Sequence, residues 1–399
     1  MLCVVVALAI VDLRHRWLER TSLRPKGDRT RRHAVRRDPD RMVEYLGGLH
    51  ESDSAVWQSF EPGLAAMAAC QWDQAIEHLR RARAKASGAQ LVPIHNQTGV
   101  CNYMQGRLDE ALRDFEESAR LATQYEDEQG KSSALANIGV MHHDSGELDS
   151  ALKQMSEALA MVRKSGVERA AAPHLANIGN VLRDRGEFDK ALKFYEEALA
   201  ISREIGDRAG VASCLGNIGS SHCDKGQLAK ALEFHADALA VLRDADDRGE
   251  MARCLGKIGS IHRYRGDLDE ALTYYEGALA LDREIGYQAG VATELGNIGL
   301  ILLDKGLHRQ AVLTLAESLD ALLTIGAAHG LRRALVGLSR CDDRLGRDQV
   351  QKLLKQTGLA DGRTADILDR VDQLRLRRPG VKKARRAQFV PRRAMAAAR

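Results

Sequence analysis

The chain has 399 residues, of which 44% are hydrophobic and only 4% aromatic, and its formal net charge is +4. Abundant Ala, Leu, Glu, Arg and Lys with only 7 Pro favour a helical protein. The 7 Cys are an odd number without paired spacing, which argues against a disulfide framework and favours a reducing compartment. We therefore expect a cytoplasmic protein.

Charge is divided unevenly along the chain. Residues 14–41 carry 11 Lys/Arg against 4 acids, a net +7, and residues 375–399 carry 10 Lys/Arg and no acid. Asp12 adds −1, so residues 42–374 must carry −12 to give the total of +4. This distribution predicts an acidic central region between two basic, mostly disordered ends, 1–41 and 375–399.

The first 11 residues are all apolar. As a helix they would span roughly 17 Å, well short of the roughly 30 Å hydrocarbon core of a membrane. They also lack the flanking features of a signal peptide. We expect an unstructured leader, with a weak N-terminal membrane anchor as the alternative, and a capping helix that begins near Asp38-Pro39.

One motif, Asn-Ile-Gly, recurs at intervals of 40 residues through the central region, with Lys257 in place of Asn in one copy. Its glycines are Gly139, Gly179, Gly219, Gly259 and Gly299. A fixed period of this size indicates stacked supersecondary units. Divergent copies begin near Trp57, and Gly346 suggests a degenerate last one. The sequence thus predicts an array of about seven repeats plus a degenerate eighth over 42–345, and capping helices over 346–374, the last of them over about 364–375.

Each unit is predicted to form two helices. In the Gly179 unit, apolar residues at helical spacing predict helices over about 168–185 and 188–205. Gly186 between them fits the left-handed C-terminal position that glycine adopts at little cost. Small residues at Gly179, Ala191 and Ala198 would let the two helices pack closely.

The order Gly179, Gly186, Ala191 and Ala198 resembles the tetratricopeptide repeat, over roughly residues 57–345. The usual unit has about 34 residues. The 40-residue period and linkers such as Arg203-Glu204-Ile205-Gly206 are similar to the repeats of Pins/LGN adaptors and kinesin light chains. The resemblance implies an all-α fold, a right-handed α-solenoid of helix-turn-helix repeats. It also implies a non-enzymatic scaffold or adaptor that binds a partner protein or peptide in its concave groove.

The resemblance places the first helix of each unit along this groove. An amide side chain can donate to and accept from a peptide backbone at once, so the motif asparagines could hold an extended peptide. They are Asn137, Asn177, Asn217 and Asn297, and they are similar to the Asn ladder of O-linked N-acetylglucosamine transferase. The alternative is that they bond neighbouring helices.

Chaperone-binding tetratricopeptide domains hold a terminal carboxylate with residues from three units. Matched by offset, this chain supplies Asn180, Asn217, Arg253 and Lys257, although Ala176 stands where the first Lys would be. Arg183 and Arg263 would add positive charge nearby. The resemblance therefore implies an extended, acidic peptide as ligand, and a chance match of offsets is the alternative.

The sequence contains no Gly-rich phosphate loop, metal-binding His pair or nucleophile elbow, so we predict no catalytic residue, metal site, cofactor or small-molecule substrate. His142, His222 and His262 recur where Leu182 stands, which indicates packing. The alternative function is a nucleic-acid- or membrane-associated scaffold whose basic ends make weak polyanion contacts or bind the acidic array itself.

Overall fold

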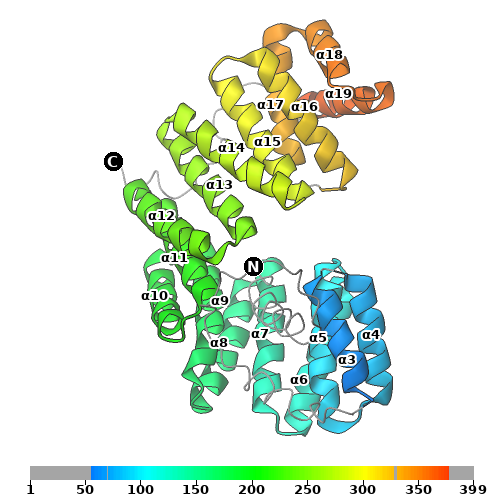
Figure 1. Ribbon diagram of the computed structural model, residues 1–399, viewed down its shortest axis with the longest axis vertical. Helices are drawn as coiled ribbons and strands as arrows, with labels where there is room; N and C mark the ends of the chain where they lie inside the picture. Colours follow the sequence, from blue (N-terminus) through cyan, green and yellow to red (C-terminus); the bar gives the residue numbers. More distant parts are fainter. Residues whose placement is uncertain (1–54, 70, 328–329, 377–399) are drawn as a thin grey trace, which may run out of the picture. The chain divides into compact units, whose positions relative to one another are not determined.

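A computed structural model describes residues 55–69, 71–327 and 330–376. These residues form helices α3 to α19 with no strand among them, which confirms the predicted all-α class. Successive helices lie side by side in pairs (Figure 1). The predicted leader, the capping helix near Asp38 and nearly all of the basic C-terminal end lie outside the described residues. No described helix is long and apolar enough to cross a membrane.

The first helices of the successive pairs are α3 (Trp57–Ala68), α5 (Leu91–Met104), α7 (Glu128–Asp144), α9 (Ala171–Asp184), α11 (Arg208–Asp224), α13 (Arg248–Arg265), α15 (Gln288–Asp304) and α17 (Leu331–Leu345). The second helices are α4 (Trp72–Lys85), α6 (Leu108–Gln124), α8 (Leu148–Lys164), α10 (Phe188–Glu204), α12 (Leu228–Ala245), α14 (Leu268–Glu284), α16 (His308–Thr324) and α18 (Arg347–Gln356). Helix α19 (Asp361–Leu376) follows and covers the last helix predicted from the sequence.

Helix α9 begins later than the sequence pattern predicts. Residues Glu168–Ala170 form a 3₁₀ turn, and the α-helix starts at Ala171. The reason is Pro173, which has no backbone N–H and is tolerated best in the first turn of a helix. The end of the helix is as predicted, since Gly186 has a left-handed φ of +80°.

The motif glycines allow the two helices of a unit to touch. A Cβ atom added at Gly179 would lie 2.6 Å from the Tyr195 ring, and one at Gly139 would lie 2.7 Å from Met155 Cγ. Ala191 and Ala198 on the facing helix are fully buried. Glycine and alanine are thus required where the helix backbones approach each other most closely.

The chain divides into two compact units, Met1–Cys214 and Leu215–Arg399, and each is described by itself below. In the first unit, Phe60, Leu79 and Phe115 are central to a core shared by several repeats. In the second, α16 to α19 enclose a core that includes Leu315, Leu338 and Ile367.

Candidate functional site

The candidate groove residues of the first unit differ in what they contact. Asn137 Nδ2 donates to Asn96 Oδ1 at 2.9 Å, which joins α7 to α5. Asn180 is 2% exposed and accepts a hydrogen bond of 2.7 Å from the Tyr195 hydroxyl on α10. Asn177 is half-buried, and its side chain makes no hydrogen bond within the described part of the chain. Arg183 is half-buried beside Asp184, with Nη2 and Oδ1 3.6 Å apart.

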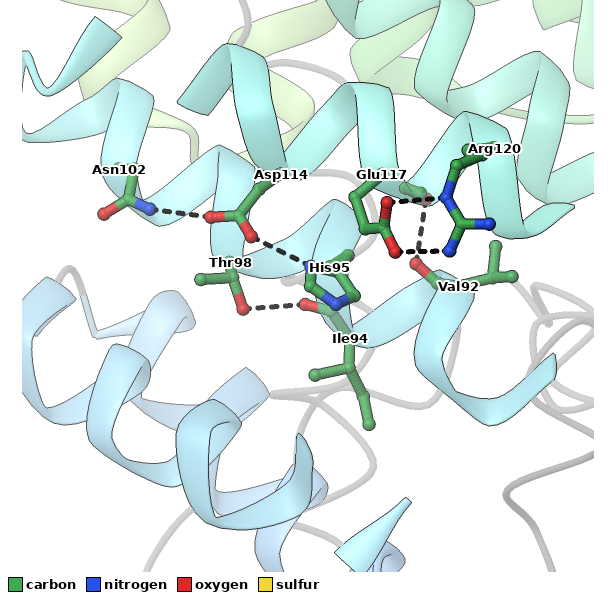
Figure 2. A network of polar contacts seen from close by, with 9 residues as sticks. Val92, Ile94, His95, Thr98, Asn102, Asp114, Glu117 and Arg120 are labelled. Atoms are coloured by element: carbon green, nitrogen blue, oxygen red, sulfur yellow. Dashed lines mark hydrogen bonds and ion pairs between the residues drawn. The ribbon is translucent and has the colours of Figure 1, made fainter. Parts of the chain in front are cut away.

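A polar network joins α5 to α6 in the same unit. Asp114 accepts from Asn102 Nδ2 at 2.9 Å and lies 2.9 Å from His95 Nδ1 (Figure 2). The Ser118 hydroxyl donates to the Val92 carbonyl. Asn102 is buried and His95 largely so. Sequence reasoning missed this network because His95, Asn102 and Asp114 do not recur in the other units. Only the serine contact recurs, since Ser318 donates to the Ala292 carbonyl. Its partners come from two facing helices, so it stabilises their packing.

In the second unit, the motif position is occupied by Asn217, Lys257 and Asn297. Asn217 is half-buried, and its side chain bonds none of the described residues. Asn297 is 7% exposed and donates from Nδ2 to Glu294 Oε2 at 3.0 Å on the same helix. Lys257 is exposed. The predicted Asn ladder thus contains both residues that bond neighbouring side chains and residues that face outward.

Helix α13 carries a continuous stripe of exposed residues along one face. Arg253, Lys257, Ser260 and Tyr264 lie at helical spacing and are all exposed. We call these four residues the α13 stripe. On α15 the corresponding residues Asn297 and Leu300 are buried, and on α11 Asn217 and Ser220 are half-buried. The stripe is therefore more open to a ligand than the same positions on the helices before and after it.

The charge of α13 also differs from that of its neighbours. It carries five Lys/Arg and one Glu, a net +4, whereas α11 is neutral and α15 has two acids and no base. Tyr264, which is 53% exposed, stands where the sister helices have an acid. The residues at that register are Asp144, Asp184, Asp224 and Asp304. The stripe is thus a basic surface that has lost the negative charge found at its end in other repeats.

Surface ion pairs hold several of these basic groups. Arg253 pairs with Glu250 on its own helix. Arg263 bonds Asp304 at 3.1 Å and so connects α13 to α15, while Arg265 bonds Asp267 at 3.1 Å. Such pairs in solvent contribute about 0–1 kcal/mol each. A ligand carboxylate could therefore replace them at little cost.

Two buried titratable groups interact with the charges of this stripe. His235 on α12 is 2% exposed, and burial, aided by the charges of Lys257 and Arg253, lowers its pKa to about 4. Glu294 on α15 is 8% exposed, and burial raises its pKa to about 7, against the opposing effect of its hydrogen bond from Asn297. Sequence reasoning missed Glu294. The only sequence feature that pointed to burial of this position was that Cys214 and Cys254 occupy it in the two preceding repeats.

Two of the recurring histidines pack on the facing helix, while His142 lies 2.9 Å from Glu147 through Nδ1. The ring of His222 stacks on Phe234 with centroids 5.3 Å apart, and the ring of His262 stacks on Tyr274 at 5.2 Å. Cys254 is buried and lies with Sγ 3.1 Å from the His235 carbonyl oxygen. Within residues 55–69, 71–327 and 330–376, no group of three or more His, Cys, Asp and Glu side chains could hold a metal ion.

A model of the tetratricopeptide repeat matches residues 90–164, 168–244 and 250–324, which is more than half of the chain. The chain belongs to the tetratricopeptide repeat family. The predicted α-solenoid of helix-turn-helix repeats is confirmed by this match, and the fold is that of a protein-interaction scaffold, generally without catalysis. No curated protein matches the chain significantly.

Solved structures show the same fold at low identity. The apo form of the quorum sensor NprR from B. thuringiensis is 17% identical with a TM-score of 0.57, covering 82% of this chain and 93% of that one. Aspartyl phosphate phosphatase F from Bacillus subtilis is 14% identical with a TM-score of 0.54, covering 94% and 91%. A Rap protein complexed with competence and sporulation factor is 15% identical with a TM-score of 0.53, covering 80% and 97%. At these identities the likeness extends to the repeat architecture alone.

Proposed function

We propose that these tetratricopeptide repeats bind an extended, acidic segment of a partner protein, and that the α13 stripe is the centre of the binding surface. The observation that carries this proposal is the exposure and net charge of +4 of α13, between a neutral and an acidic helix. Arg253 and Lys257 are four residues apart, so they face the same side and can meet successive carboxylates. Because both side chains are exposed, each such pair would contribute about 0–1 kcal/mol, and several together would hold the segment.

The remaining candidate residues take different roles in this proposal. Asn217, in the same unit as the stripe, would bond the ligand backbone, because its amide is half-buried and bonds no described side chain. Arg263, on the same helix as the stripe, would add positive charge. The amides that already bond protein groups would instead hold the first helices in place: Asn137, Asn180 and Asn297.

The test is direct binding of a defined peptide to the full chain. The probe is a fluorescein-labelled ten-residue peptide of alternating Asp/Glu and Gly/Ser, with a Lys-containing peptide of equal length as the comparison. Arg253→Glu combined with Lys257→Glu should weaken acidic-peptide binding at least tenfold, since two favourable charges become repulsive. The matched control is Lys230→Glu, a charge reversal at an exposed position of α12, which should leave the affinity unchanged.

Equal weakening by the control, or no preference for the acidic peptide over the Lys-containing one, would overturn the proposal. The basic ends of the chain lie outside the described residues, so the weak polyanion contact remains a prediction. Affinity for heparin that the double variant does not alter would assign that contact to a surface other than the α13 stripe.

A further inference from the structure

Glu294 occupies an unusual place beside the α13 stripe. Its Oε1 would lie 2.9 Å from a Cβ atom added at Gly256, so the carboxyl group packs against the backbone of α13 at the residue before Lys257. A larger residue at 256 would require this carboxyl group to shift. The other carboxyl oxygen, Oε2, accepts the hydrogen bond of 3.0 Å from Asn297. A buried carboxyl group of α15 thus lies against the helix that bears the α13 stripe.

Charged groups from three neighbouring helices act on Glu294. Asp282 on α14 favours its protonated form, while Arg333 on α17 and, as the smallest influence, Lys257 on α13 favour its ionised form. Burial acts in the same direction as Asp282 and is the largest influence. The protonation state of Glu294 therefore depends on several opposing influences. The positive charge of Lys257 is one of those that stabilise the ionised carboxylate.

We propose that binding of an acidic segment at the α13 stripe is coupled to the uptake of a proton by Glu294. The inference rests on the proposed function and adds its regulation. A ligand carboxylate that engages Lys257 screens that positive charge and brings a negative charge towards Glu294. Both effects disfavour the Glu294 carboxylate, so the group takes a proton from the buffer when the ligand binds.

The direction of the pH dependence follows from this coupling. In the unbound chain Glu294 has a pKa of about 7, so it is partly ionised at neutral pH. Ligand carboxylates titrate near pH 4 and stay ionised well above it. The affinity for an acidic segment should therefore rise as the pH falls from 8 to 6. A ligand-induced rise of one pKa unit would tighten binding roughly fivefold over that interval.

One experiment tests the coupling without a ligand. The carboxyl carbon of Glu294 is followed by NMR against pH in the full chain labelled at Glu, and its signal is assigned by its loss in Glu294→Gln. Lys257→Met should move the titration midpoint upward, because a supporting positive charge is removed. Lys230→Met on α12 should leave the midpoint in place. An unchanged midpoint in Lys257→Met would overturn the coupling.

A second experiment uses the acidic ten-residue peptide and isothermal titration calorimetry. Near pH 7, the apparent binding enthalpy should differ between phosphate and Tris buffers by the heat of a fraction of a proton taken up by the protein. The dissociation constant should fall roughly fivefold from pH 8 to pH 6. In Glu294→Gln, which is always neutral, both effects should vanish while binding persists. Glu276→Gln, at an exposed position of α14, should behave like the wild type.

The two failures are distinguishable. An absence of peptide binding at every pH would overturn the proposed function, whatever the NMR titration shows. Binding whose pH dependence is the same in the wild type and in Glu294→Gln would leave the proposed function standing. It would overturn the proton coupling and assign the pH dependence to another group.

Discussion

His235 illustrates how one residue departs from the pattern of its repeat. The corresponding positions are occupied by Tyr195 and Tyr275, which pack on motif glycines and bond Asn180 and Ser260 through their hydroxyls. His235 packs on Gly219 in the same way, but its Nδ1 is buried without a hydrogen-bond partner among the described residues. His235 thus places a ring that can gain a proton where the two flanking repeats have a neutral tyrosine.

We predict that His235→Tyr removes an acid sensitivity of the fold. Burial lowers the pKa of His235 to about 4, below the ordinary value of 6.5, so only the unfolded chain gains the proton at mildly acidic pH. The buried neutral ring therefore contributes its full share of the folding stability above pH 6.5, and this share declines as the pH falls towards 4. At pH 5 the loss is about 2 kcal/mol. The new Tyr could bond Ser220, which is at the register of Ser260.

The measurement is the thermal midpoint of both proteins at pH 8 and pH 5. The variant should lose less stability than the wild type on acidification, and the gap between the two should widen as the pH falls. A gap that is the same at both pH values would contradict the assignment of this sensitivity to His235.

At the scale of the element, glycine serves two different purposes inside the first helices. Gly179 faces Tyr195 so closely that a Cβ atom would overlap the ring. Gly216 lies within α11, yet a Cβ atom there would meet nothing within 4 Å. Both are glycines in the middle of a helix, where this residue costs about 0.5–1 kcal/mol relative to alanine. They differ only in what faces them.

We therefore predict opposite effects for the same substitution at these two sites. Gly179→Ala should destabilise the protein by about 1–3 kcal/mol, because Tyr195 must move to admit the methyl group. Gly216→Ala should stabilise it by about 0.5–1 kcal/mol through the helix propensity of alanine. Chemical denaturation of each variant against the wild type measures both. Destabilisation of equal size at both sites would show that packing against the second helix is not what requires glycine.

At the scale of the whole molecule, a repeat array depends on what closes its ends. In the second unit, Arg347 forms an ion pair with Asp342, with Nη2 and Oδ2 3.1 Å apart, and also pairs with Asp372, so it links α17, α18 and α19. Asp342 is buried. A buried carboxylate is costly without a positive partner. This arginine is therefore a central contact of the terminal helices.

We predict that Arg347→Met loosens the C-terminal end of the array locally. The expected cost is about 1–3 kcal/mol, since Asp342 loses a positive partner while the apolar stem of the side chain is kept. Hydrogen exchange should quicken in α17 to α19 and stay unchanged in α5 to α10, because repeats contact mainly their neighbours. The control is Arg344→Met at an exposed position of α17. Uniform quickening along the chain would contradict this local role.

The sequence by itself was sufficient for the architecture. A 40-residue period, with glycine and alanine at fixed offsets, determines where helices end and where they approach each other, because these requirements are local and repeat in every unit. The same regularity identified the positions of Asn177, Asn217 and Lys257 as one register. These features can be recognised in a single sequence because each is repeated several times along the chain.

Only the tertiary structure decided which asparagines of that register bond other side chains and which do not. Asn137 and Asn217 are identical in the motif, yet one bonds Asn96 in the preceding repeat and the other bonds no described side chain. Glu294 is an ordinary acidic residue in the sequence, and its raised pKa comes from burial against Gly256. Burial and hydrogen-bond partners depend on residues about forty positions away, and a repeated motif does not specify them.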